Sequence, residues 1–111
     1  MKITSFDFEY DKIIVGKYQI CELLGEGWEG EVYRAIELST KISCAIKFFF
    51  PHRNIRNKVA ASYAKKLHNL SESPVAIKYY NQEVIRFSGE DVTALVFEYA
   101  EGEILSEFLN R

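Results

Sequence analysis

The spacing of apolar residues changes along the chain, and this change limits the folds that the chain can adopt. Apolar and polar residues alternate in Tyr18–Leu24 and again in Glu31–Glu37, with the glycine-rich stretch Gly25–Gly30 between them. This pattern predicts a β-hairpin. A third strand is predicted at Ile42–Phe50, because the apolar run there ends at Pro51.

The next part of the chain has a helical period. A helix is predicted over Ile55–Leu70, with Asn54 as its N-cap and Pro74 in the loop that ends it. Its apolar stripe has spacings of three and four and consists of Val59, Tyr63, Leu67 and Leu70. A second hairpin is predicted from Gln82–Ser88 and Val92–Glu98.

Weaker patterns lie near the two ends. Phe6–Asp11 alternates as F-D-F-E-Y-D and predicts an extra N-terminal strand, and Glu103–Asn110 has the pattern of the first turns of another helix. The central elements follow the order of three strands, one helix and two strands. The sequence therefore predicts an α+β domain in which one helix packs on an antiparallel sheet.

Composition excludes several classes of protein. With 111 residues, of which 48% are hydrophobic, the chain is sized for one compact domain. Its net charge of −2 gives no general attraction to nucleic acid or to an anionic membrane. Cys21 and Cys44 lack disulfide-framework or zinc spacing, and no signal-peptide or membrane-spanning run is present, so we expect a cytoplasmic protein with reduced thiols.

Two features carry chemical information. Gly25–Val32 fits G-x-G-x-x-G-x-V, in which glycines let backbone amides approach phosphate oxygens closely. A dinucleotide-binding fold is excluded, because a strand and not a helix follows the third glycine. Lys47 interrupts the apolar strand, and it lies either on an exposed face or against an anionic group.

Four patterns agree in type, order and spacing. The glycine-rich hairpin, A-I-K at Ala45–Lys47, the helix that follows, and L-V-F-E-Y-A-E-G at Leu95–Gly102 together resemble the N-terminal, ATP-binding lobe of eukaryotic-like serine/threonine protein kinases. The resemblance covers residues 18–111 and leaves residues 1–17 as an N-terminal extension. It implies a five-stranded antiparallel sheet with one large helix, and ATP with Mg²⁺ as cofactors of the complete protein.

The resemblance also implies roles for ten residues. Gly25, Gly27 and Gly30 would cover the nucleotide phosphates, and Lys47 would contact the α- and β-phosphates. Leu24, Val32 and Ala45 would be apolar contacts of the adenine ring, and Phe97 would close the back of the pocket. The backbone carbonyl and amide that pair with the adenine edge would come from Glu98 and Ala100. Core packing alone is the competing explanation for Val32, Ala45 and Phe97.

The chain departs from the family at the partner of Lys47. The resemblance aligns Tyr63 with the helix glutamate that pairs with this lysine in the family, and no Asp or Glu occurs between residues 38 and 71. Either Lys47 finds another carboxylate, such as Glu72, Glu83 or one on a missing segment, or the usual active arrangement does not form.

The glycine-rich turn is acidic, which is a second departure. The family often has an aromatic residue just before the third glycine, where this chain has Glu29, with Trp28 one place earlier. Because Glu26 and Glu31 lie nearby, we expect weakened affinity for a triphosphate.

The sequence also lacks the catalytic loop H-R-D-x-x-x-x-N and the segment D-F-G, which supply the base and hold the metals. The chain is therefore expected to be a fragment of a larger ATP-dependent phosphotransferase that is inactive alone. Its partners would be the missing C-lobe and, in the parent protein, a protein substrate. The alternative is a free-standing kinase-like lobe that regulates another protein by binding. A D-x-x-x-x-N and a D-x-G encoded downstream would favour the fragment, and a stop codon would favour the module.

Two surfaces were assigned from the sequence. The stretch from Lys41 to Lys66 contains no acid and seven basic residues: Lys41, Lys47, Arg53, Arg56, Lys58, Lys65 and Lys66. This pattern indicates either a solvated helix face or a docking surface for an acidic or phosphorylated partner. Nucleic acid is disfavoured because no motif for it is present. A homodimer of the isolated lobe is expected through apolar side chains at the C-terminal end: Phe97, Tyr99, Leu105, Phe108 and Leu109.

Overall fold

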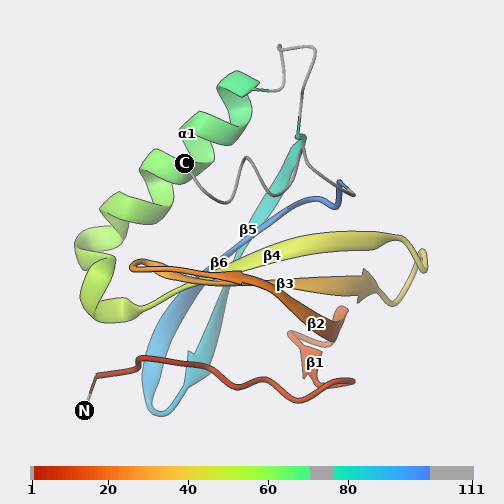
Figure 1. Cartoon of the computed structure of the whole chain (residues 1–111), viewed down its shortest axis with the longest axis horizontal. Coiled ribbons are helices and arrows are strands. Elements are labelled where there is room, and N and C mark those ends of the chain that lie inside the picture. Colours follow the sequence, from red (N-terminus) through yellow and green to blue (C-terminus); the bar gives the residue numbers. More distant parts are fainter. Residues whose placement is uncertain (1, 71–76, 101–111) are drawn as a thin grey trace.

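The computed structural model describes residues 2–70 and 77–100, which form one antiparallel sheet with one α-helix (Figure 1). The sheet has six strands in the order β1-β2-β3-β4-β6-β5. In chain order the strands are β1 (Ile13–Ile14), β2 (Tyr18–Glu26), β3 (Gly30–Glu37), β4 (Ser43–Phe49), β5 (Tyr79–Phe87) and β6 (Glu90–Glu98). The predicted α+β class and both predicted hairpins are confirmed, and β1 adds a sixth strand at the edge.

The extra N-terminal strand is not where the sequence predicted it. Phe6–Asp11 forms no strand, and the short β1 follows it and pairs with the start of β2. The alternation of burial is real, because Phe6 and Phe8 are buried while the acids between and after them are exposed. In the first part of this segment side chains accept the backbone N–H groups, since the N–H of Phe6 donates to the Glu31 carboxylate at 2.9 Å. Only at its end does the segment meet a strand, where the N–H of Asp11 donates to the carbonyl of Ile20 in β2 at 2.8 Å.

The helix begins later than predicted. Helix α1 spans Lys58–Leu70 and follows two 3₁₀ segments, η1 (Pro51–Arg53) and η2 (Ile55–Asn57). Left-handed backbone at Arg56 and Asn57, with φ of 56° and 60°, keeps these residues out of the helix.

The structure shows the predicted cap of the helix and the first half of its predicted apolar stripe. Asn54 still caps the helical region, because its Oδ1 accepts the N–H of Ala60 at 2.9 Å. Val59 and Tyr63 pack toward the sheet as predicted, while the side chains of Leu67 and Leu70 lie outside the described part of the structure. The predicted loop at Ser71–Pro74 and helix at Glu103–Asn110 also lie outside it.

The sheet has two buried faces, and successive residues of β4 alternate between them. Cys44, Ile46 and Phe48 belong to the cluster that packs beneath the N-terminal segment, residues 2–12, and we call this side the extension face. Ala45 and Phe49 belong to the cluster beneath α1, and we call this side the helix face. Figure 1 shows α1 and the N-terminal segment on opposite sides of the sheet.

Candidate functional site

The glycine-rich stretch forms the hairpin turn between β2 and β3. Gly25 pairs with Val32 inside the hairpin, and the N–H of Gly27 donates to the carbonyl of Gly30 at 3.0 Å. The register of β3 against β4 sets Val32 opposite Lys47 and Gly30 opposite Phe49. The turn is therefore fixed beside the end of β4, next to the strand lysine.

The surroundings of Gly27 and Gly30 place different demands on the residue at each position. A Cβ on Gly30 would lie 2.0 Å from the backbone oxygen of Phe48, so the close approach of β3 and β4 already requires a glycine there. A Cβ on Gly27 would meet nothing within 4 Å, and its φ is not in the left-handed region. The fold thus explains Gly30, whereas the space at Gly27 is open to a ligand.

Lys47 lies inside the helix face, where it is only 6% exposed. Its ammonium group forms an ion pair with the carboxylate of Glu29 in the turn. The same nitrogen lies 3.9 Å from the centre of the Tyr63 ring and 5.4 Å from that of Phe49. Burial lowers the pKa of Lys47, and the interaction with Glu29 works in the opposite direction.

Of the two alternatives that the sequence left open for Lys47, an exposed face or an anionic partner, the structure shows the anionic partner, and the acid is Glu29 rather than one of those named. Glu83 pairs with Lys17 at 3.2 Å instead, and Glu72 lies outside the described residues. Glu29 was overlooked because the family resemblance directs attention to the helix. The available signal was the absence of any acid between residues 38 and 71, which leaves the neighbouring turn as a source.

The second acid assigned to the turn faces the other way. Glu31 is 3% exposed and lies on the extension face, where it accepts the Phe6 N–H and the hydroxyls of Ser5 and Tyr33. It therefore does not add to the negative charge beside Lys47. Its role was missed by sequence reasoning, and alternation along β3 could have indicated it, because Glu31 and Val32 must lie on opposite faces.

Most of the predicted adenine contacts come together on the helix face. Val32, Ala45 and Phe97 are buried in the cluster beneath α1, and Leu24 and Ala100 pack at its margin. The remaining residue, Glu98, is the last of β6 and is half-buried, and its N–H donates to the carbonyl of Lys78 at 2.7 Å. The sequence predictions for these residues thus converge on one apolar wall beside Lys47.

This burial corrects one element of the predicted homodimer. Phe97 is 0% exposed, because Tyr63 of α1 packs against it with ring centres 6.5 Å apart. It does not form part of an exposed apolar surface. Tyr99 is half-buried, and Leu105, Phe108 and Leu109 lie outside the described residues.

The predicted cationic surface is smaller than the sequence indicated. Lys47 is buried in the helix face, and Lys41 lies in the β3–β4 connection, at the far end of the sheet from the start of α1 (Figure 1). The other five basic residues are exposed on η1, η2 and α1: Arg53, Arg56, Lys58, Lys65 and Lys66.

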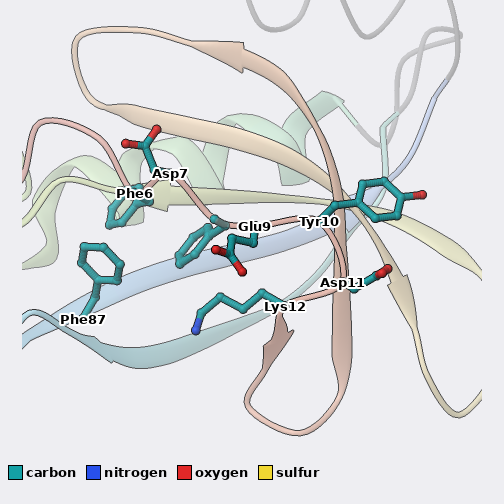
Figure 2. Close-up of a pocket in the computed structure, with 8 residues that line it drawn as sticks. Phe6, Asp7, Glu9, Tyr10, Asp11, Lys12 and Phe87 are labelled. Carbon is teal, nitrogen blue, oxygen red and sulfur yellow. The ribbon is translucent and has the colours of Figure 1, made fainter.

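A separate groove of about 460 Å³ lies along the N-terminal segment (Figure 2). Figure 2 shows Phe6 and Phe87 at one end of this groove and Tyr10 and Asp11 at the other. None of its lining residues belongs to the predicted site. Within residues 2–70 and 77–100 there is no group of three or more potential metal ligands, and no helix there is long and apolar enough to cross a membrane.

The antiparallel sheet with one packed helix has the fold of the amino-terminal lobe of protein kinases, to which the short β1 adds an edge strand. A solved structure of a kinase domain matches 85% of this chain with a TM-score of 0.65 and 21% identity, and the match covers 27% of that domain. No protein-family model matches the chain.

The sequence comparisons point to the serine/threonine-protein kinases. A probable cyclin-dependent serine/threonine-protein kinase of Dictyostelium discoideum is 33% identical over 92 residues, which are 81% of this chain and 6% of that protein. The tousled-like 2 serine/threonine-protein kinase of Xenopus tropicalis is 29% identical over 102 residues, which are 86% of this chain and 14% of that protein. The human protein of the same name is also 29% identical over 102 residues. The chain is similar in sequence to these kinases and spans a small part of their length.

Proposed function

We propose that this chain is the nucleotide-binding lobe of a serine/threonine-type protein kinase. In this role the apolar wall of the helix face receives the adenine ring, and Lys47 binds the α- and β-phosphates of Mg-ATP. The observation that carries the proposal is a lysine, 6% exposed, set in an apolar wall beside a glycine turn. A buried ammonium group requires an anionic partner, which Glu29 supplies in this structure. The phosphates of a nucleotide whose base enters the apolar wall would take the same position.

The open space at Gly27 supports this assignment. The fold does not require a glycine at this position, and the open space beside its backbone is where a phosphate group would lie. Glu98 and Ala100 lie at the end of β6 and just beyond it, where backbone groups would meet the adenine edge.

In the parent protein the reaction would transfer the γ-phosphoryl group of ATP to a hydroxyl of a protein substrate. The terminal bridging P–O bond of ATP breaks, a new P–O bond forms to the hydroxyl oxygen, and ADP leaves. This lobe supplies positioning of the nucleotide. The catalytic base and the metal-holding residues are absent from this sequence, so the chain alone would not catalyse the transfer and would depend on a C-lobe.

One observation favours a second candidate, a non-catalytic kinase-like lobe that regulates another protein by binding. Tyr63 occupies the helix position where the family has the acid that pairs with the strand lysine, and Glu29 has taken over the ion pair. Such a lobe would keep the fold without binding nucleotide productively.

Calorimetry with Mg-ATP and with adenosine tests the first candidate. We expect the chain to bind Mg-ATP with a dissociation constant on the order of 10⁻⁴ M or weaker, because half of the pocket is contributed by the other lobe. Lys47→Met should weaken Mg-ATP binding by at least about fivefold and leave adenosine binding unchanged. Lys58→Met removes an exposed charge from α1 and is the matched control.

The outcomes separate the two candidates. Equal Mg-ATP affinity in the wild type and in Lys47→Met would overturn the assignment of Lys47. Absence of binding by both Mg-ATP and adenosine would favour the regulatory lobe. Phosphoryl transfer from labelled ATP by pure chain would contradict the expectation that it is inactive alone.

A further inference from the structure

We propose that Glu29 is a built-in competitor of nucleotide phosphate, which occupies Lys47 when the site is empty and must be displaced for a nucleotide to bind. The inference rests on the proposed function, and it adds a regulatory contact to the same site. It concerns the turn between β2 and β3, where an acid stands directly before the third glycine.

Three contacts hold this turn down on the sheet. The Glu29 carboxylate pairs with the Lys47 ammonium group, and the Glu29 carbonyl accepts the N–H of Phe50 at 3.0 Å. The guanidinium carbon of Arg53 lies 4.5 Å from the centre of the Trp28 ring. The turn is therefore attached to β4 through Glu29 and to η1 through Trp28.

The surroundings of Lys47 leave little room for two anions. The rings of Tyr63 and Phe49 lie around its ammonium group, and its side chain is only 8% exposed. A phosphate that reached Lys47 with Glu29 in place would set like charges side by side in a poorly solvated site, where Coulomb repulsion is strong. Phosphate and Glu29 must therefore exchange rather than share the lysine.

Glu29 is able to leave, and Lys47 is not. The Glu29 side chain is 28% exposed and comes from the turn, so its carboxylate can move into water. Lys47 lies in the middle of the sheet, between β3 and β6. Because Tyr63 stands where an acid would otherwise hold the lysine, Glu29 also keeps Lys47 paired until a nucleotide arrives.

Glu29→Gln tests the competition, with Glu26→Gln as a matched control from the exposed part of the same turn. We expect Glu29→Gln to bind Mg-ATP about tenfold more tightly than the wild type, with unchanged affinity for adenosine, which has no phosphate. Glu26→Gln should stay within about twofold. In a Lys47→Met background Glu29→Gln should give no gain, because the contested cation is gone.

A second readout does not depend on a bound nucleotide. Trp28 is the sole tryptophan of the chain, so its fluorescence reports directly on the turn. Because Trp28 is already 63% exposed, its mobility rather than its accessibility reports on the turn. The fluorescence anisotropy of Trp28 should be lower in Glu29→Gln than in the wild type or in Glu26→Gln, and circular dichroism should show that all three are folded. Equal anisotropy in the three proteins would overturn the attachment of the turn through Glu29.

The affinity outcomes distinguish failure of this inference from failure of the proposed function. If the wild type binds Mg-ATP and Glu29→Gln binds it equally or more weakly, the competition is refuted while the nucleotide site stands. If no variant binds Mg-ATP or adenosine, the nucleotide site itself is refuted, and the competition with it.

Discussion

Two glutamates in one hairpin show how differently the two faces of the sheet are used. Glu31 lies on the extension face, is 3% exposed, and accepts hydrogen bonds from the backbone of Phe6 and from two hydroxyls. Glu29 lies at the turn beside the helix face, has a side chain that is 28% exposed, and pairs with Lys47. Glu31 thus links the N-terminal segment to β3, whereas Glu29 pairs with the lysine of the candidate site.

The surroundings of these acids differ in the same way. On the extension face the rings of Phe6, Phe8 and Phe48 contact one another at centre distances of 4.7 to 5.8 Å, and Phe6 also packs on Phe87 and Phe50. On the helix face a cation lies within the apolar cluster. Burial of hydrocarbon stabilises the first face, while the second retains a charged group that hydrophobic packing alone does not explain.

The largest expected effect comes from opening the extension face. Phe6→Ala should lower the free energy of unfolding by about 3–5 kcal/mol, because a ring that is 3% exposed is lost and a cavity remains. Tyr10→Ala, at a residue of the same segment that is 63% exposed, should change it by less than about 0.5 kcal/mol. Urea unfolding measures both. A small loss for Phe6→Ala would mean that the N-terminal segment does not stabilise the sheet.

An intermediate effect is expected from Glu31. Glu31→Ala leaves the N–H of Phe6 without its acceptor and should lower the free energy of unfolding by about 1–3 kcal/mol. Glu26→Ala removes an exposed acid of the same hairpin and should be close to neutral. Equal stability of the two variants would show that the N-terminal segment is held by its rings alone.

The fold was predictable wherever side-chain period decided the structure. The strands at Tyr18–Glu26 and Gly30–Glu37 were predicted from alternation, and the strand at Ser43–Phe49 from an apolar run that ends at Pro51, which is typical of a strand buried on both faces. The strand predicted at Phe6–Asp11 was wrong because alternation reports which side chains are buried, and not which group accepts the backbone N–H. The start of the helix was missed because left-handed backbone at Arg56 has no signature in the sequence.

The site was predictable in its parts but not in its central contact. Burial of Val32, Ala45 and Phe97 beside Lys47 follows from their parity along the strands. The pairing of Lys47 with Glu29 depends on the conformation of a short turn and on the register of β3 against β4. Neither is fixed by residue type, so the sequence could require an acid near Lys47 without identifying it.

The smallest expected effect is a difference in alkaline sensitivity between the two faces. On the extension face, burial raises the pKa of Tyr33 from 10.0 to about 12 and that of Cys44 from 9.0 to about 12. The unfolded chain loses these protons at lower pH than the native chain does, so the free energy of unfolding falls as the pH rises from about 9 to about 12. Lys47 has the opposite sign, because burial lowers its pKa and the native chain loses that proton first as the pH rises toward 10.5.

Urea unfolding between about pH 8 and about pH 11 therefore separates these contributions. Compared with the wild type, Tyr33→Phe should lose less stability over this interval. The substitution removes a hydroxyl that the unfolded chain deprotonates at lower pH than the native chain does. Lys47→Met should lose more stability, because Lys47 is the group whose lowered pKa opposes the loss of stability at alkaline pH. The pKa of Tyr63 is also raised by burial, but Tyr63 is present in every variant and does not affect the comparison. Tyr10→Phe changes an exposed ring and should follow the wild-type curve. Parallel curves for Tyr33→Phe and Lys47→Met would show that burial does not shift the pKa values of Tyr33 and Lys47 in opposite directions.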